Sequence, residues 1–172
     1  MTQQFEIAVA QSNIDWLGRK VTGAHNGTIN LKQGTLTVTN GQLTGGNFTI
    51  DTTSIKILDI SDAATNAQFA QHLASEDFFA WDRYPEATFV ITAVQGSHIE
   101  GDLTIKGITH TVGFDASLHL SGATLTASGK IIIDRTLYGI RFRSGNFFKD
   151  LGDTLIYNDF ELNVTLTAKA IA

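Results

Sequence analysis

Five histidines and several acidic residues are the side chains of this sequence whose types and spacing fit metal-binding or acid–base chemistry. His98, Glu100 and Asp102 alternate along one stretch, and residues two apart on a strand share a face, so they would offer a set of metal ligands. The stretch follows a Gly-Ser turn, however, and this pattern is more typical of a solvated hairpin face. We therefore predict that the chain has no metal site.

Acidic residues that flank a possible cleft would fit glycoside hydrolysis, and Glu76, Asp77 and Asp82 lie close together in the sequence. That reaction needs two carboxylates facing each other across a cleft, whereas neighbouring acids beside a serine are typical of a helix end. Ser144 has no histidine nearby in sequence to activate it. We predict no catalytic residues and no enzyme activity, with a barrel enzyme acting on a bound lipid or small molecule as the alternative.

Composition narrows the class of protein further. The motifs GxSxG, GxGxxG, HExxH and the P-loop are absent, and without cysteine there is no disulfide, thiolate metal site or thiol nucleophile. The 172 residues fit one domain, residues 1–172. The formal charge is −5, and lysines and arginines form no stripe, which argues against nucleic acid as a partner.

The chain also lacks signals for a membrane. No run approaches the ~18 apolar residues of a membrane span, so we expect no stable membrane insertion. The start, MTQQFEIAVAQSNIDW, has neither a basic nor an apolar region of a signal peptide. We expect a cytoplasmic protein as the chain stands, or a periplasmic one if a leader was removed.

Aromatic side chains are unusually dense in HLASEDFFAWDRYPEATF, residues 72–89. Phe78, Phe79, Trp81 and Tyr84 fall within seven residues, and acidic residues flank them. Three interpretations are open: a helix end packed on a core, a lid over an apolar pocket, or part of an active site.

The elements that must position these residues are mostly strands. Residues 160–168, FELNVTLTA, alternate apolar and polar side chains, as do TINLK, GDLTIKG and VGFDASLHL. Glycine-containing dipeptides between the runs predict turns at residues 26–27, 33–34, 40–41, 45–46, 95–96 and 121–122. About nine or ten short antiparallel strands predict an all-β sandwich or barrel.

Two segments break this period. Apolar residues recur at helical spacing in residues 62–75, with Asp62 or Ser61 as the N-cap. Residues 143–153, RSGNFFKDLGD, carry a second phenylalanine pair. Because much of the aromatic content lies in these two irregular segments, a hollow barrel with a lid is one interpretation, and two satellite clusters under loops are the other.

Several stretches together resemble the YceI-like family of polyisoprenoid-binding, lipocalin-like barrels. SIKILDI precedes the helix, and His72, Leu73, Asp77, Phe78, Phe79, Tyr84, Pro85 and Phe89 match the HL–x–DFF–x–YP–x–F segment. GDLTIKGITHTVGF, IDRTLYGIRF and FELNVTLTA follow in the family's order. NIDWLGRKVTGAHNGTINL departs from the commoner opening, and Ala70-Gln71 replace an Arg-Asp pair. These departures concern which lipid headgroup the pocket would accept, and they do not change the expected barrel.

The resemblance implies a closed antiparallel eight-stranded lipocalin/streptavidin-like barrel with one or two short helices at its mouth. It implies an apolar or amphiphilic small-molecule partner: an isoprenoid or similar long-chain lipid (quinone, prenol or prenyl phosphate) held inside for transport, storage or stress response. It implies no cofactor besides that lipid. The region 72–89 then becomes the lid, or else a clamp that fixes the helix to the rim, and His72 is expected to orient it by hydrogen bonding.

Burial of one methylene contributes roughly 0.8 kcal/mol, so a few isoprene units suffice for tight retention. Arg19, Lys20, Arg141 and Arg143 are candidates for a pyrophosphate but form no conspicuous cluster, which favours a neutral lipid. A non-catalytic scaffold or interaction module, with a homodimer, is a further alternative. The expected ligand-binding residues are Trp16, Phe69, Leu73, Phe78, Phe79, Trp81, Phe89, Ile105, Phe114, Leu118, Phe142, Phe147, Phe148, Phe160, Leu162 and Val164.

Overall fold

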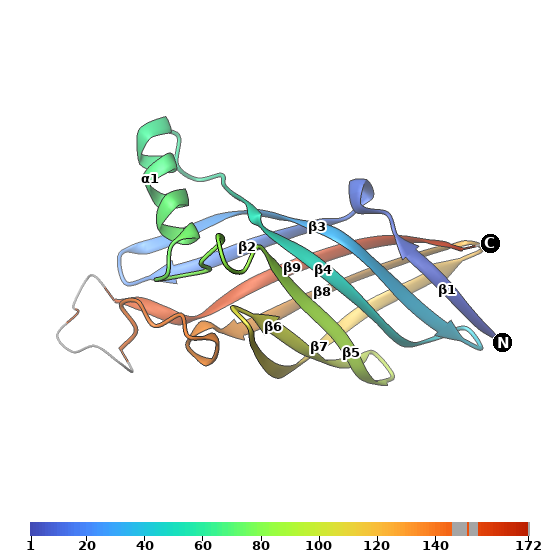
Figure 1. The fold of residues 1–172 in the computed structure, drawn as a ribbon. Helices are drawn as coiled ribbons and strands as arrows, with labels where there is room; N and C mark the ends of the chain where they lie inside the picture. Colours follow the sequence, from blue (N-terminus) through green and yellow to red (C-terminus); the bar gives the residue numbers. More distant parts are fainter. Residues whose placement is uncertain (146–150, 152–154, 172) are drawn as a thin grey trace.

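One antiparallel sheet of nine strands makes up most of the structure (Figure 1). The computed structural model describes residues 1–145, 151 and 155–171. The strands are β1 (Thr2–Ile7), β2 (Asn13–Lys20), β3 (Gly23–Thr39), β4 (Gln42–Ile57), β5 (Glu86–Gln95), β6 (His98–Ile105), β7 (Ile108–Ser121), β8 (Thr124–Asp134) and β9 (Ile156–Ala170). The helix α1 (Ala63–Ala74) and the 3₁₀ turns η1 (Val9–Gln11) and η2 (Arg135–Tyr138) complete the described elements.

The sheet closes on itself through eight strand positions. Its order is β1-β3-β2-β9-β8-β7-β6-β5-β4, and β3 also pairs with β4, which closes the ring. Both β1 and β2 lie between β3 and β9, because η1 interrupts what would otherwise be one long strand. The prediction of a closed eight-stranded antiparallel barrel is confirmed, and the strand count agrees with the nine or ten expected.

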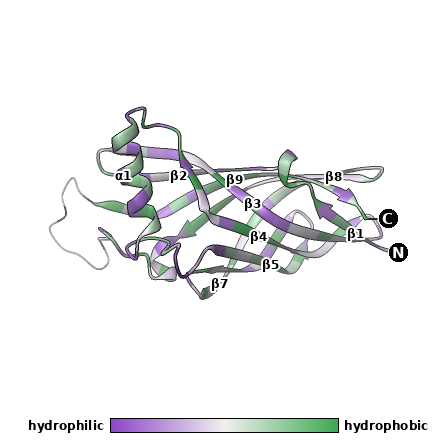
Figure 2. Cartoon of the chain, turned by 45° about the horizontal axis from the view of Figure 1, so that its top comes forward, coloured by the Kyte–Doolittle hydropathy of each residue, from purple (hydrophilic) through white to green (hydrophobic). Residues whose placement is uncertain are grey.

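Hydrophobic and hydrophilic residues follow one another along the strands, as the changing colours of Figure 2 show, and buried positions alternate with exposed ones. On β9, Leu162, Val164, Leu166 and Ala168 are buried, as their spacing predicts. On β7, Ala116 is buried, whereas Leu120 is 38% exposed because it lies at the end of the strand, beside the turn to β8. The strand period therefore fixes which face packs, except at the ends.

Three of the six predicted turns are wrong. The chain does turn at residues 40–41, 96–97 and 122–123. In contrast, Gly27 and Gly34 lie inside the long strand β3, and Gly46 lies inside β4. A Cβ on Gly27 would lie 1.7 Å from the carbonyl oxygen of Lys56, so this glycine permits close approach of β4. At Gly46, φ is +148°, and the adjacent register shift between Thr37 and Val38 marks an irregularity of the ladder.

The helix follows its sequence signals closely. Asp62 is the N-cap, and its Oδ2 accepts a hydrogen bond from the amide of Thr65 at 2.9 Å. The helix α1 ends at Ala74 and lies across one end of the barrel, while both termini lie at the other (Figure 1). In the described part of the chain, no helix is long and apolar enough to cross a membrane.

The two ends of the barrel differ in packing. Phe5 and Ala168, near the termini, are fully buried, and Leu36, Val38 and Leu125 fill the space around them. Toward the α1 end, β7 and β8 separate: their ladder runs only from Ala116–Gly129 to the turn among the described pairs. The turn η2 fills this gap, since His110 Nε2 donates to the carbonyl of Leu137 at 2.9 Å.

Candidate ligand-binding cavity

A cavity of about 510 Å³ opens inside the barrel at the α1 end, where four residues of the helix contribute to its lining. Its deeper wall is aliphatic, with buried Ile50, Ala87, Leu103, Ile133 and Leu162 contributed by β4, β5, β6, β8 and β9. This volume lies within the roughly 300–1,000 Å³ typical of small-molecule sites, which are mostly apolar. The barrel interior is thus solid at one end and hollow at the other.

The structure brings together more than half of the residues expected from the sequence to bind a ligand. Those that line the cavity are Trp16, Phe69, Leu73, Phe78, Phe79, Ile105, Phe142, Phe160 and Leu162. Their positions come from β2, β6, β9, α1, the loop after α1 and the segment after η2. That they bind a ligand remains a prediction.

Five other expected residues do not line this cavity: Trp81, Phe89, Phe114, Leu118 and Val164. Phe89 is 2% exposed and packs between Phe48 and Phe114, with ring centroids 5.2 and 5.8 Å away. Phe89 lies one inward position beyond Ala87 on β5, so this aromatic group closes the floor below the cavity. Phe147 and Phe148 lie outside the described residues.

The dense aromatic stretch forms part of the rim. Phe78 and Phe79 line the cavity, while Glu76, Asp77 and Asp82 are exposed. This arrangement, apolar rings inward and acids outward, is the one expected of a lid. Trp81 departs from it: its indole N–H is buried without a partner in the described structure, and the ring lies outside the cavity.

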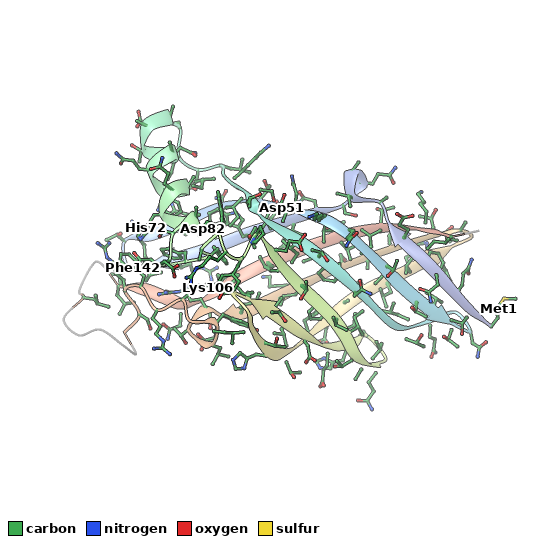
Figure 3. The ribbon with its side chains drawn as sticks, in the orientation of Figure 1. Met1, Asp51, His72, Asp82, Lys106 and Phe142 are labelled. Atoms are coloured by element: carbon green, nitrogen blue, oxygen red, sulfur yellow. The ribbon has the colours of Figure 1, made fainter. Side chains whose placement is uncertain are left out.

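Three rings form a contact across the mouth, which we call the rim cluster (His72, Phe78 and Phe142). The His72 ring is 4.9 Å from that of Phe78 and 4.5 Å from that of Phe142, both nearly perpendicular. His72 Nε2 also lies 3.0 Å from Asp77 Oδ2, which fits the expected orienting role. Figure 3 shows His72 and Phe142 at the α1 end and Met1 at the opposite end.

The loop after α1 is held by backbone contacts. Phe79 N–H donates to Leu73 O at 3.0 Å, and Trp81 N–H donates to Ala74 O at 2.9 Å. Lys106 Nζ, in the turn from β6 to β7, donates to the carbonyl of Glu76 at 2.8 Å. The loop is therefore fixed to both the helix and the barrel rim.

Sequence reasoning missed a buried cation in the wall. Arg135 is 4% exposed, lines the cavity, and donates to three backbone carbonyls, those of Ile140, Ile156 and Tyr157, at 3.0 Å each. Burial lowers the pKa of its guanidinium, an effect that Asp134 partly opposes. No signal in the sequence marks this role, because the acceptors are main-chain oxygens.

Most of the other polar side chains of the wall form hydrogen bonds with protein groups. Thr52 Oγ1 donates to Tyr84 O at 2.8 Å, and Thr65 Oγ1 donates to Asp62. His25 Nδ1 lies 2.7 Å from Asp59 Oδ2, and its ring packs against Phe69 with centroids 4.8 Å apart. These pairs hold the helix and the wall in place.

His98 and Ser144, the candidates for metal binding and for nucleophilic chemistry, lie outside this cavity. His98 contacts Glu100 and Asp115, but Asp102 accepts from Thr111 instead. Within the described residues, no three His, Cys, Asp or Glu side chains gather in a way that would hold a metal ion. Ser144 is fully buried, and its hydroxyl donates to Asn158 Oδ1 at 2.6 Å.

Solved structures share this fold. BcnA of Burkholderia cenocepacia superposes with a TM-score of 0.75 over 95% of this chain and 99% of its own, at 23% identity. A polyisoprenoid binding domain from Saccharophagus degradans, implicated in plant cell wall breakdown, gives a TM-score of 0.65 over 97% and 98% of the two chains, at 12% identity. At these identities the likeness concerns the fold.

Sequence relatives match over a shorter stretch. A UPF0312 protein of Staphylococcus aureus strain USA300 is 41% identical over 80 residues, and one of Pseudomonas putida strain W619 is 36% identical over 89 residues. These matches cover 41% and 45% of this chain, and 46% of each relative. The model of the YceI-like domain matches residues 5–168. The chain therefore belongs to the YceI-like family.

Proposed function

We propose that this protein binds one isoprenoid or similar long-chain lipid in the hollow end of its barrel. The observation that carries the proposal is the apolar cavity of about 510 Å³, which has an aliphatic wall and an aromatic rim. Such a site binds by burial of hydrocarbon, and each five-carbon isoprene unit would contribute on the order of 3 kcal/mol before entropic losses. A quinone, a prenol and a prenyl phosphate all offer such a chain.

The fold relatives support the same class of ligand. The Saccharophagus degradans structure of this fold is described as a polyisoprenoid binding domain. Membership of the YceI-like family adds to this support, because the resemblance of the sequence implies the same ligand. We propose transport, storage or a stress response as the role of the bound lipid, and a homodimer as a form in which two mouths face each other.

We propose binding without catalysis. Among the described lining residues, the hydroxyls of Thr52 and Thr65 are committed to a carbonyl and to a helix cap. His25 and His72 each pair with an aspartate, but their rings pack against Phe69 and Phe78 as part of the rim. A nucleophile activated by a neighbouring base, which a hydrolytic enzyme of this type would need, has no counterpart among these contacts.

Mass spectrometry of an organic extract from protein purified without added lipid is the first experiment. We expect a stoichiometric species with a long hydrocarbon chain, matched by an equal mass increase in the native spectrum. Delipidated protein should then bind geranylgeraniol, with a change in the fluorescence of Trp16, which lines the cavity.

A variant that fills the cavity tests the proposal, and a variant with the same substitution at an exposed site is its control. Ala87, 5% exposed and in the cavity wall, becomes Trp in one variant, and exposed Ala93 on the same strand becomes Trp in the other. Ala87→Trp should weaken geranylgeraniol binding at least tenfold, and Ala93→Trp should not. Equal binding by both variants, or no binding of prenols and quinones by the delipidated protein, would contradict the proposal and favour a scaffold.

A further inference from the structure

Three residues with positively charged side chains lie next to Ile156 at the cavity mouth, two through their backbones and Arg135 through its guanidinium. Lys20 on β2 is the cross-strand partner of Ile156. The carbonyl of Arg143 accepts the Ile156 N–H at 2.9 Å, and Arg135 Nη2 donates to the Ile156 carbonyl at 3.0 Å. All three cationic residues line the cavity. Barrel closure thus gathers, at one side of the mouth, charges that are up to 123 positions apart (143 − 20).

Among the described residues these three cations form no ion pair, and only Asp134 acts electrostatically on Arg135, without a salt bridge. Arg135 uses three of its five N–H donors on backbone carbonyls, and the guanidinium carbon of Arg143 lies 5.0 Å from the centre of the Phe142 ring. A fourth lining cation, Arg19, differs because it pairs with Glu161 at 3.0 Å.

The charge of the mouth opposes that of the chain. The whole protein carries a formal charge of −5, yet Asp159, which is exposed, is the single acid among the described lining residues. A buried or half-buried cation is costly unless an anion or several hydrogen bonds compensate it. Low-dielectric walls also focus the field of such a group on whatever enters the opening.

We propose that the mouth binds the anionic end group of the lipid, a phosphate or a carboxylate, beside Lys20, Arg135 and Arg143. This inference rests on the proposed function and narrows its ligand to an acidic amphiphile. The chain of the ligand lies along the apolar wall, and its charged end replaces water at the cations. An acidic lipid differs from the neutral lipid expected from the sequence, in which these cations look scattered. The reason for the difference is that the fold places all three on the lining of one cavity.

Paired ligands with equal chains test this proposal. Geranylgeranyl monophosphate should bind delipidated protein at least tenfold more tightly than geranylgeraniol, since charge-assisted hydrogen bonds contribute about tenfold to a hundredfold. The preference should shrink as salt is raised. Palmitate and hexadecanol form the second pair: a gain for palmitate as well would show that the mouth accepts carboxylates, and a gain for the phosphate alone would show that it selects phosphates.

A double variant and its matched control identify the residues. Lys20→Gln with Arg143→Gln should reduce the preference for the phosphate to within about twofold. The preference is the ratio of the two dissociation constants, so an effect of the substitutions on binding of the shared hydrocarbon chain cancels. Lys56→Gln with Lys169→Gln removes the same net charge at exposed positions away from the cavity and should retain the preference. Arg135 is left intact in both variants because of its three backbone contacts.

The outcomes separate the inference from the proposed function. If geranylgeraniol binds as tightly as its phosphate, the inference is overturned and the lipid carrier stands. If the phosphate is preferred and both double variants lose that preference equally, a general charge effect replaces the assigned site. If neither prenyl compound binds, the proposed function fails and the inference fails with it.

Discussion

The ring of His72 stands at 83° to the ring of Phe142, with centroids 4.5 Å apart, and this contact joins α1 to the segment after η2 across the mouth of the cavity. Phe78 closes the triangle, 5.8 Å from Phe142. These two segments lie far apart in the sequence. A ligand that enters or leaves through this side of the mouth would have to separate these rings.

Removal of Phe142 should therefore speed ligand release. Phe142→Ala deletes two ring contacts, each contributing about 0.5–1.5 kcal/mol, so we expect dissociation of a bound prenol to become about five- to a hundredfold faster. Stopped-flow displacement measures this rate. His72→Phe keeps an aromatic ring and loses only the exposed contact with Asp77, so its dissociation rate should stay near that of the parent protein. Unchanged release from Phe142→Ala would show that the rim cluster does not gate the cavity.

Gly27 gives a prediction about folding. The Cβ of Gly27→Ala would overlap the Lys56 carbonyl and lie 2.7 Å from Cζ2 of Trp16, and backbone cannot yield as a flexible side chain can. We expect a loss of about 3 kcal/mol or more in the free energy of unfolding, measured by urea denaturation. Gly45→Ala is the control, because its Cβ meets nothing within 4 Å. If both variants were equally stable, β3 and β4 would be farther apart than the structure places them.

The same glycine shows what sequence reasoning can and cannot supply. The alternation in β9 and the Asp62 cap are local patterns, so the strand faces and the helix could be predicted from neighbouring residues. Gly27 looks like a turn glycine until β4 is placed beside it, and Lys56 lies 29 positions away (56 − 27). Non-local contacts of this kind are absent from any short window.

Some residues of the cavity could likewise be predicted from the sequence, and others could not. Phe78 and Phe79 stand out by their density and do line the cavity, whereas Leu103 and Ile133 lack any such mark and form its wall. Phe89 is expected from the sequence to bind the ligand, but its position on β5 places it in the solid floor. An inward-facing residue lines the cavity only if it lies beyond the solid end of the barrel. The length of that solid end depends on packing between strands that are distant in sequence.

Arg135 gives a second prediction about stability. Arg135→Lys keeps the charge but cannot reach the three carbonyls together, so at least one or two buried acceptors would lose their donor, at a cost of about 2–5 kcal/mol. Thermal and urea unfolding measure this loss. Arg19→Lys makes the same exchange at an exposed ion pair and should cost less than about 1 kcal/mol. A stable Arg135→Lys variant would mean that the segment after η2 is held by other contacts.

Tyr138 provides a prediction about alkaline pH. Its side chain is 1% exposed, its hydroxyl has no hydrogen-bond partner in the described structure, and burial raises its pKa to about 12 from a usual value near 10.0, with a further contribution from Asp134. The unfolded chain therefore loses this proton at lower pH than the folded protein. The contribution to stability is full below pH 10 and is lost as the pH rises toward 12.

Tyr138→Phe should remove that pH dependence. At pH 7 the variant should be more stable by about 1 kcal/mol, because it no longer buries an unpaired hydroxyl. Between pH 10 and 12 it should lose less stability than the parent, as measured by urea denaturation at each pH. Tyr157→Phe, at a residue that is 47% exposed, is the control and should change stability at pH 7 by less than about 0.5 kcal/mol. A destabilised Tyr138→Phe would reveal that the hydroxyl makes a bond in solution, and a parallel alkaline decline in both proteins would assign that decline to other groups.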